Sequence, residues 1–113
     1  MKRSSNILLL FIGLFLLSFI LPKKKKKIKV WMIGDSTMCI QPKERYPVTG
    51  WGTPFVYFFD STVTIENKAR GGRSTRTFLS EGRWKEVFES LQEDDYVLMQ
   101  FGHNDEAKEP QYQ

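Results

Sequence analysis

The amino-acid sequence predicts an α/β fold over residues 28–113, in which a parallel sheet carries helices on its faces. Two observations predict it. Three short apolar or β-branched runs have the composition of strands, and segments with helix signals lie between them. The first and third runs are apolar without strict alternation, which is typical of strands covered on both faces. At 113 residues the chain is expected to form one domain at most.

Residues 1–27 are set apart from this domain. A basic start precedes the apolar stretch Ile7–Leu21, and the lysine run Lys23–Lys27 follows it. The stretch is shorter than the about 20 residues that span a bilayer, and it matches the hydrophobic region of a signal peptide. No small-x-small cleavage site follows, and lysines on the far side oppose export. We expect an exported protein, extracellular or periplasmic, whose residues 1–27 are a signal peptide or a membrane anchor with lysines that contact anionic lipid.

The charge distribution argues against nucleic acid as a partner. The net charge is +4, but residues 1–29 carry eight positive charges and no acid, whereas residues 30–113 carry nine positive and thirteen negative charges. Residues 30–113 therefore lack the basic groove with interleaved aromatics that nucleic-acid binding requires. The single cysteine, Cys39, excludes an intramolecular disulfide and a multi-cysteine zinc site, and we interpret it as a small buried hydrophobe.

The predicted strands follow one another with clear ends. The first, Ile28–Gly34, is an apolar, β-branched run that stops at a glycine. The second, Ser61–Asn67, is rich in β-branched residues, and the third, Tyr96–Gly102, again ends in glycine. Strands of this kind, separated by helices, are expected to pair in parallel.

Two helices are predicted between the strands. Thr53 offers an N-cap and Pro54 suits the first helical position, which starts a helix into the apolar segment 55–59, although aromatic residues and valine also suit a strand. The second helix shows apolar residues at the spacing i, i+3, i+4 and i+7. This stripe comprises Trp84, Val87, Phe88 and Leu91.

A polar loop with glycine follows each predicted strand. These loops cover residues 34–37, 67–77 and 102–105. Ligands of open α/β sheets bind at the carboxyl ends of the strands, where such loops meet. The sequence therefore predicts a functional site at this edge of the sheet.

The residues of these loops are suited to acyl transfer. Ser36 is a candidate nucleophile, but serine is a weak nucleophile unless a base takes its proton. An oxyanion needs hydrogen-bond donors, and the Ser36 N–H, the Gly72 N–H and the Asn104 side-chain amide are candidates. Purely structural roles stay open for these loops. Asp35 and Ser36 suit a turn or an N-cap, and Asn104 with Asp105 suits a helix cap. Three arginines are surface charges or hold an anionic sugar carboxylate: Arg70, Arg73 and Arg76.

Four sequence blocks carry a resemblance to a known family. They are IGDSTM, GWG, NKARGGRSTRTF and FGHND, in this order, between about Lys29 and Asp105. In these blocks the chain resembles the GDSL/SGNH hydrolase superfamily and, within it, the rhamnogalacturonan acetylesterases. The resemblance implies a three-layer α/β/α sandwich with a flavodoxin-like outline. It also implies that Ser36 is the nucleophile, that Gly72 and Asn104 complete the oxyanion hole with the Ser36 N–H, and that acetyl groups leave pectic polysaccharide through an acyl-serine, without a metal or other cofactor.

The base that the resemblance implies has no counterpart in this sequence. The family places its catalytic Asp and His in an Asp-x-x-His motif near the C-terminus of a longer chain, and no such motif occurs here. The only histidine, His103, is interpreted as structural or as lining the substrate cleft, a role also open to Arg73. Asp35 and Asp105 are interpreted as supports of their loops. The fold is therefore expected to be truncated after the third strand.

Three functional hypotheses follow. The first is an N-terminal part of an esterase that acts on an acetylated acidic polysaccharide. The second is a non-catalytic remnant, secreted or membrane-tethered, that binds carbohydrate. The third is an SGNH esterase or lipase for another ester, although the arginine-rich second loop favours an acidic saccharide. The sequence leaves the oligomeric state open.

Overall fold

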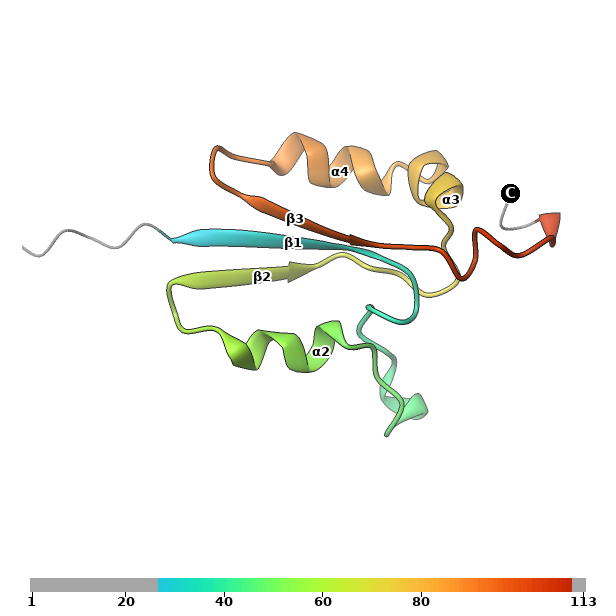
Figure 1. The fold of residues 1–113 in the computed structure, drawn as a ribbon, viewed down its shortest axis with the longest axis horizontal. Coiled ribbons are helices and arrows are strands. Elements are labelled where there is room, and N and C mark those ends of the chain that lie inside the picture. Colours follow the sequence, from blue (N-terminus) through green and yellow to red (C-terminus); the bar gives the residue numbers. More distant parts are fainter. Residues whose placement is uncertain (1–26, 111–113) are drawn as a thin grey trace, which may run out of the picture.

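The computed structural model describes residues 27–110, which form a three-stranded parallel sheet with helices on both faces. Strand β1 (Ile28–Gly34) lies in the centre, between β2 (Val63–Asn67) and β3 (Tyr96–Gln100) (Figure 1). Both neighbours pair with β1 in parallel. The predicted α/β class and the three predicted strands are therefore confirmed, with β2 beginning and β3 ending two residues inside the predicted bounds.

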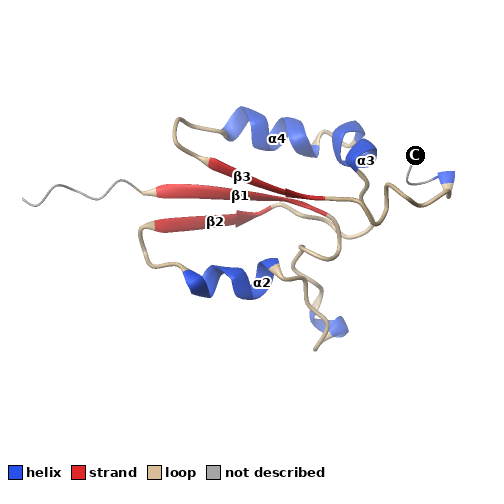
Figure 2. Cartoon of the chain, viewed as in Figure 1, coloured by secondary structure: helices blue, strands red, loops and turns tan. Residues whose placement is uncertain are grey.

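Helices α3 (Thr75–Ser80) and α4 (Arg83–Ser90) cover one face of the sheet (Figure 2). The buried cluster on this face comprises Trp31, Ile33, Phe78 and Val87. Half-buried apolar side chains pack around this cluster, and they are Trp84, Leu91, Val97 and Phe101. Burial of such apolar area is the main favourable term in folding.

The other face of the sheet is covered by α2 (Gly52–Phe55) and the short 3₁₀ helix η2 (Val56–Phe58) that continues it (Figure 1). Alternate residues of β1 point to this face, and two of them, Val30 and Met32, are buried. Every residue from Val30 to Gly34 is buried, which confirms that β1 is covered on both faces. The same prediction is wrong for β3, because β3 lies at an edge of the described sheet and its Tyr96 and Met99 are exposed. The described residues thus form three layers, as the family resemblance implies.

The start of α2 differs from the prediction. The structure begins the helix at Gly52 with Trp51 as N-cap, and no side chain caps it, whereas Thr53 was the predicted N-cap. Pro54 therefore lies inside the first turn. It is tolerated there because the first N–H groups of a helix have no intrahelical acceptor.

Helix α4 confirms the predicted amphipathic stripe only in part. Val87 is fully buried, but Phe88 is 63% exposed, so Phe88 does not belong to the core. Its ring packs instead against Trp84, with centroids 5.9 Å apart. The physical reason is that α4 is short and meets the sheet through a stripe narrower than the one predicted.

Helix α3 was not predicted, because the sequence predicts a loop over 67–77. The structure shows a capping box, in which the Ser74 Oγ accepts from the Thr77 N–H at 3.2 Å and the Ser74 N–H donates to the Thr77 Oγ1 at 2.9 Å. Such reciprocal capping satisfies two N–H groups that a helix start otherwise leaves unpaired. The Ser-x-x-Thr spacing at 74–77 was the available signal.

The leader or anchor predicted for the N-terminal segment falls on residues 1–26, which lie outside the described part of the chain. Within residues 27–110, no helix has the length and apolar character needed to span a bilayer.

Candidate active site

The loops that follow the three strands meet at one end of the sheet, on the right in Figure 1. Backbone hydrogen bonds join them there. The Arg70 N–H of the second loop donates to the Gly34 carbonyl at 2.9 Å, and the Asp35 N–H of the first loop donates to the Gln100 carbonyl at 3.2 Å. The Asn104 side chain of the third loop reaches the second loop at the Arg73 carbonyl, at 3.0 Å. The structure therefore brings the predicted site loops together.

Ser36 lies in a tight turn directly after β1. The Asp35 carbonyl accepts from the N–H groups of Met38, at 3.3 Å, and Cys39, at 3.1 Å. The fully buried Asp35 carboxylate closes the turn, because its Oδ1 accepts from the Thr37 N–H at 2.9 Å and from the Thr37 hydroxyl at 2.8 Å. This arrangement leaves Ser36 half-buried at the sheet edge.

Two neighbours support the Ser36 turn from outside. The Gln41 side-chain amide donates to the Ser36 carbonyl at 2.8 Å. Gly71, in the second loop, faces Ser36 so closely that a Cβ at this position would lie 3.6 Å from the Ser36 Cβ. Sequence reasoning missed Gln41, for which no pattern gives a signal, and it also missed the place of Gly71 beside Ser36.

The Gly-Trp-Gly block packs against the same turn. The Trp51 N–H donates to the Thr37 carbonyl at 2.9 Å, and the Gly52 N–H donates to the Met38 carbonyl at 3.2 Å. A Cβ at Gly50 or at Gly52 would clash with backbone atoms of this turn. The two glycines are therefore required by close backbone approach and not by chemistry.

The predicted oxyanion donors all lie in the joined loops. The N–H groups of Ser36 and Gly72 make no hydrogen bond within residues 27–110. Gly72 has φ = 75°, in the left-handed region that favours glycine. Asn104 is 6% exposed and donates one amide hydrogen to the Arg73 carbonyl, which leaves its second amide hydrogen. The catalytic roles of these three groups stay predictions.

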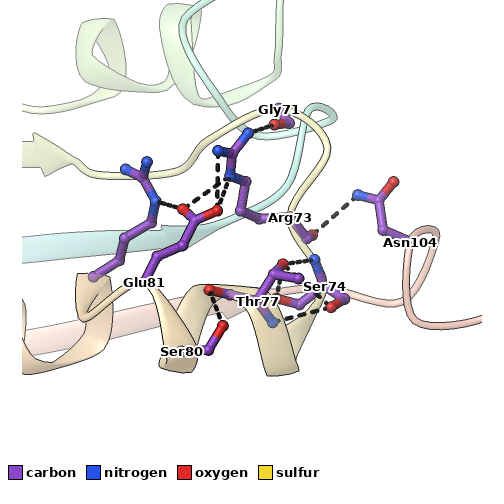
Figure 3. A network of polar contacts seen from close by, with 8 residues as sticks. Gly71, Arg73, Ser74, Thr77, Ser80, Glu81 and Asn104 are labelled. Carbon is purple, nitrogen blue, oxygen red and sulfur yellow. Dashed lines mark hydrogen bonds and ion pairs between the residues drawn. The ribbon is translucent and has the colours of Figure 1, made fainter. Parts of the chain in front are cut away.

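Figure 3 shows the polar network at the junction of the second and third loops, where Asn104 points at the Arg73 carbonyl beside the start of α3. Asp105 completes this junction by accepting from the Thr75 N–H at 3.0 Å and from the Thr75 hydroxyl. Desolvation acts to raise the pKa of Asp105, but these hydrogen bonds and those from backbone N–H groups outweigh it and hold the pKa below the ordinary value. Asp105 thus has the geometry of a loop support.

The described residues contain no partner for the Ser36 hydroxyl. No imidazole or carboxylate of residues 27–110 forms a hydrogen bond with the Ser36 Oγ. His103 is exposed and lines, with Asn104, an open hollow of about 530 Å³. No cluster of potential metal ligands occurs in this part of the chain.

Cys39 is buried beside the site, as predicted for a small hydrophobe. Burial raises the pKa of its thiol, and the Gly71 backbone and the Arg70 charge offset this only in part. A thiol with a raised pKa carries little thiolate at neutral pH, which argues against Cys39 as the nucleophile.

No protein-family model matches the chain. Curated relatives do match. The chain is 44% identical over 82 residues to rhamnogalacturonan acetylesterase RhgT of Bacillus subtilis (strain 168), which covers 73% of this chain and 35% of the relative. It is 43% identical over 77 residues to a rhamnogalacturonan acetylesterase of Emericella nidulans, covering 67% of this chain and 28% of the relative. It is 33% identical over 79 residues to the probable rhamnogalacturonan acetylesterase YesY of Bacillus subtilis, and the match covers 70% of this chain and 36% of the relative.

A solved structure shares the fold. The crystal structure of the Bacillus subtilis protein YxiM matches with a TM-score of 0.64 and 29% identity, over 72% of this chain and 23% of that protein. The chain thus spans about a third of the length of the curated relatives it matches, and less of the solved structure. The described residues have an α/β fold of the SGNH hydrolase type. The chain belongs to the family of the rhamnogalacturonan acetylesterases, which are carboxylic ester hydrolases.

Proposed function

We propose that this chain carries the nucleophile of a serine esterase that removes O-acetyl groups from an acidic, pectin-like polysaccharide. One observation carries the proposal. Ser36 stands in a tight turn directly after the central strand, at the end of the sheet where the loops that follow the three strands are joined by hydrogen bonds. The names of the relatives supply the substrate class, since each is named a rhamnogalacturonan acetylesterase.

The chemistry proceeds in two steps. The Ser36 Oγ attacks the acetyl carbonyl while a general base takes its proton, and the sugar hydroxyl leaves after receiving that proton. Water then hydrolyses the acetyl-serine and releases acetate. During both steps the developing oxyanion receives hydrogen bonds from the N–H groups of Ser36 and Gly72 and from the Asn104 amide. No metal is needed for this sequence.

The general base comes, in this proposal, from an Asp-x-x-His motif outside residues 27–110. Two features support this. The Ser36 hydroxyl has no proton acceptor among these residues, and the buried Asp35 Oδ2 has no hydrogen-bond partner there. A buried carboxylate oxygen without a donor costs free energy, so a donor from a further segment is expected to satisfy it. In this proposal the described residues are part of a longer hydrolase domain, which follows a leader segment that directs export.

The first test is to sequence the gene and its transcript past the codon for Gln113. We expect an in-frame continuation with an Asp-x-x-His motif near its end. The protein expressed from that reading frame should release acetate from acetylated rhamnogalacturonan faster than it hydrolyses short acyl-lipids. Preference for the lipid would overturn the substrate class.

A stop codon directly after Gln113 in the transcript would overturn the enzymatic proposal for this chain. The remaining hypothesis would then be a non-catalytic saccharide-binding protein. In the protein expressed from a continued reading frame, a covalent probe tests for the esterase without a substrate, because a fluorophosphonate labels an activated serine only. Labelling at Ser36 that is lost on denaturation supports the esterase.

A further inference from the structure

An open hollow of about 600 Å³ lies beside Ser36, between the loop after β1 and the loop after β2. Its wall consists of residues from these two loops, and they are Cys39, Ile40, Gln41, Pro42, Arg45, Arg70, Gly71 and Arg73. Two of these residues touch the nucleophile turn directly, because Gln41 donates to the Ser36 carbonyl and Gly71 packs against the Ser36 side chain. A molecule in this hollow would therefore lie next to the reacting group.

The hollow is positively charged. Three of its lining residues are arginines, and no aspartate or glutamate lines it. One of the three is already engaged within the protein, since the Arg73 Nη2 lies 3.0 Å from the Glu81 Oε1 and Arg73 also donates to the Gly71 carbonyl (Figure 3). Glu81 also pairs with Arg83, so it holds Arg73 in place without cancelling the whole positive charge of this corner. Arg45 and Arg70 form no ion pair with any residue of the described range.

The backbone of each of the two remaining arginines is fixed by hydrogen bonds. Arg45 ends the short 3₁₀ helix η1 (Lys43–Arg45), where its N–H donates to the Pro42 carbonyl at 3.0 Å and its carbonyl accepts from the Val48 N–H at 2.8 Å. The Arg70 N–H donates to the Gly34 carbonyl at the end of β1, at 2.9 Å. Arg45 and Arg70 are both exposed residues, so an incoming anion can reach them from solvent.

The position of Arg45 is coupled to the nucleophile turn. The Arg45 Nη1 donates to the Gln41 Oε1 at 3.4 Å, and the amide nitrogen of the same Gln41 side chain binds the Ser36 carbonyl. One side chain therefore sets the guanidinium and the turn relative to each other. A planar guanidinium binds a carboxylate through two parallel hydrogen bonds, which gives orientation as well as charge attraction.

We propose that Arg45 and Arg70 form a subsite that holds the carboxylate of a uronic acid residue in the substrate, next to the sugar whose acetyl ester meets Ser36. This deepens the proposed function and rests on it for the identity of the ester. The subsite explains why the hollow beside the nucleophile is basic in a domain whose residues 30–113 carry more acids than bases. It assigns Arg73, in contrast, to holding α3 and the second loop through Glu81.

The test is a binding measurement on the full chain, because binding needs no general base. Trigalacturonate, with one carboxylate per sugar, is titrated by calorimetry, and its carboxyl-reduced neutral form serves as the matched ligand. We expect Arg70→Gln and Arg45→Gln each to weaken trigalacturonate binding by about fivefold to tenfold, and the double variant by more, as for exposed charge-assisted hydrogen bonds. Binding of the neutral trisaccharide should be weak and unchanged in all variants.

Arg76→Gln is the matched control, because Arg76 is an exposed arginine of α3 that does not line the hollow. It removes the same charge and is expected to change binding less than twofold. Equal losses in Arg76→Gln and Arg70→Gln would overturn the subsite, since they would indicate only general charge attraction. Wild-type binding that does not distinguish the acidic from the neutral trisaccharide would overturn it as well.

A separate variant distinguishes failure of the subsite from failure of the proposed function. Ser36→Ala should bind trigalacturonate as the wild type does, because the carboxylate contacts lie on Arg45 and Arg70. If fluorophosphonate labelling at Ser36 fails in the protein that carries the Asp-x-x-His motif, while trigalacturonate binding depends on both arginines, the subsite stands and the esterase proposal falls. If labelling succeeds and the arginine variants bind normally, the esterase stands and the subsite falls.

Discussion

The turn around Ser36 and the junction of the second and third loops are built in different ways. The turn around Ser36 is held by backbone hydrogen bonds and by the buried Asp35 carboxylate, while the Ser36 hydroxyl itself has no partner within residues 27–110. At the junction, side chains make the connections, since Asn104 binds the Arg73 carbonyl and Asp105 binds Thr75.

The difference shows which parts of the site are complete within the described residues. The backbone of both regions is held by local hydrogen bonds, whereas the Ser36 hydroxyl and the buried Asp35 Oδ2 have no hydrogen-bond partner within residues 27–110. Substitutions in the turn should therefore affect catalysis or the packing behind it, and substitutions at the junction should affect stability first. The predictions below take these two regions in order of expected effect.

Ser36→Ala should have the largest effect. In a chain that carries its general base, turnover of acetylated rhamnogalacturonan should fall by about 10⁴-fold or more, because the acyl-enzyme cannot form. The free energy of unfolding should stay unchanged, as measured by urea denaturation. Ser80→Ala, at an exposed serine of α3, is the control and should keep full activity. Retained turnover in Ser36→Ala would mean that another group is the nucleophile.

Gly52→Ala tests the packing behind the turn. Its new Cβ would clash with the Met38 carbonyl and with the Asn67 side-chain amide, so the backbone must shift. We expect a loss of about 1–3 kcal/mol in the free energy of unfolding, as for other overpacked sites. Gly71→Ala is the matched control, since its Cβ would meet Ser36 at an ordinary contact distance of 3.6 Å. Equal losses in both variants would contradict the packing argument.

Asn104→Ala tests the junction. The variant removes a buried side-chain hydrogen bond to the Arg73 carbonyl, and we expect a loss of about 1–2 kcal/mol in the free energy of unfolding. In an active chain it should also lower kcat by about 10²-fold, the usual cost of losing an oxyanion donor. Normal kcat with reduced stability would restrict Asn104 to the structural role.

Asp105→Asn should have the smallest effect, and it depends on pH. Because the folded-state pKa of Asp105 lies below its ordinary value of 3.8, ionised Asp105 stabilises the fold above that pH. The contribution is lost as the pH falls through the lower folded-state value. Thermal unfolding should therefore show the wild type more stable than the variant at neutral pH, with the gap closing below about pH 4. A constant gap across this range would show that Asp105 acts through packing alone.

Much of the fold and of the site was predictable from local patterns. The strand that ends at Gly34, the loop that carries Ser36 and the Gly-bearing loops after the other strands follow from runs of apolar residues that stop at polar ones. Parallel pairing then brings their ends to one edge. The sequence also shows that its single histidine lies in the third loop.

Other features depended on partners far along the chain. Helix α3 was missed because its capping residues also suit a turn, and Phe88 was placed in the core because periodicity does not say how wide a contact the sheet makes with α4. The start of α2 at Gly52 likewise follows from close packing against Met38 and not from the Thr53-Pro54 signal.

The sequence by itself determined the α/β class, the order of the strands along the chain and the place of Ser36 at a strand end, because apolar periodicity and strand ends are local properties. Only the tertiary structure decided which arginines face the nucleophile turn. Arg73 pairs with Glu81, while Arg45 and Arg70 come from separate loops to line one hollow. Charges pair through space, so a distribution of charge along the chain does not tell which of them the fold leaves free.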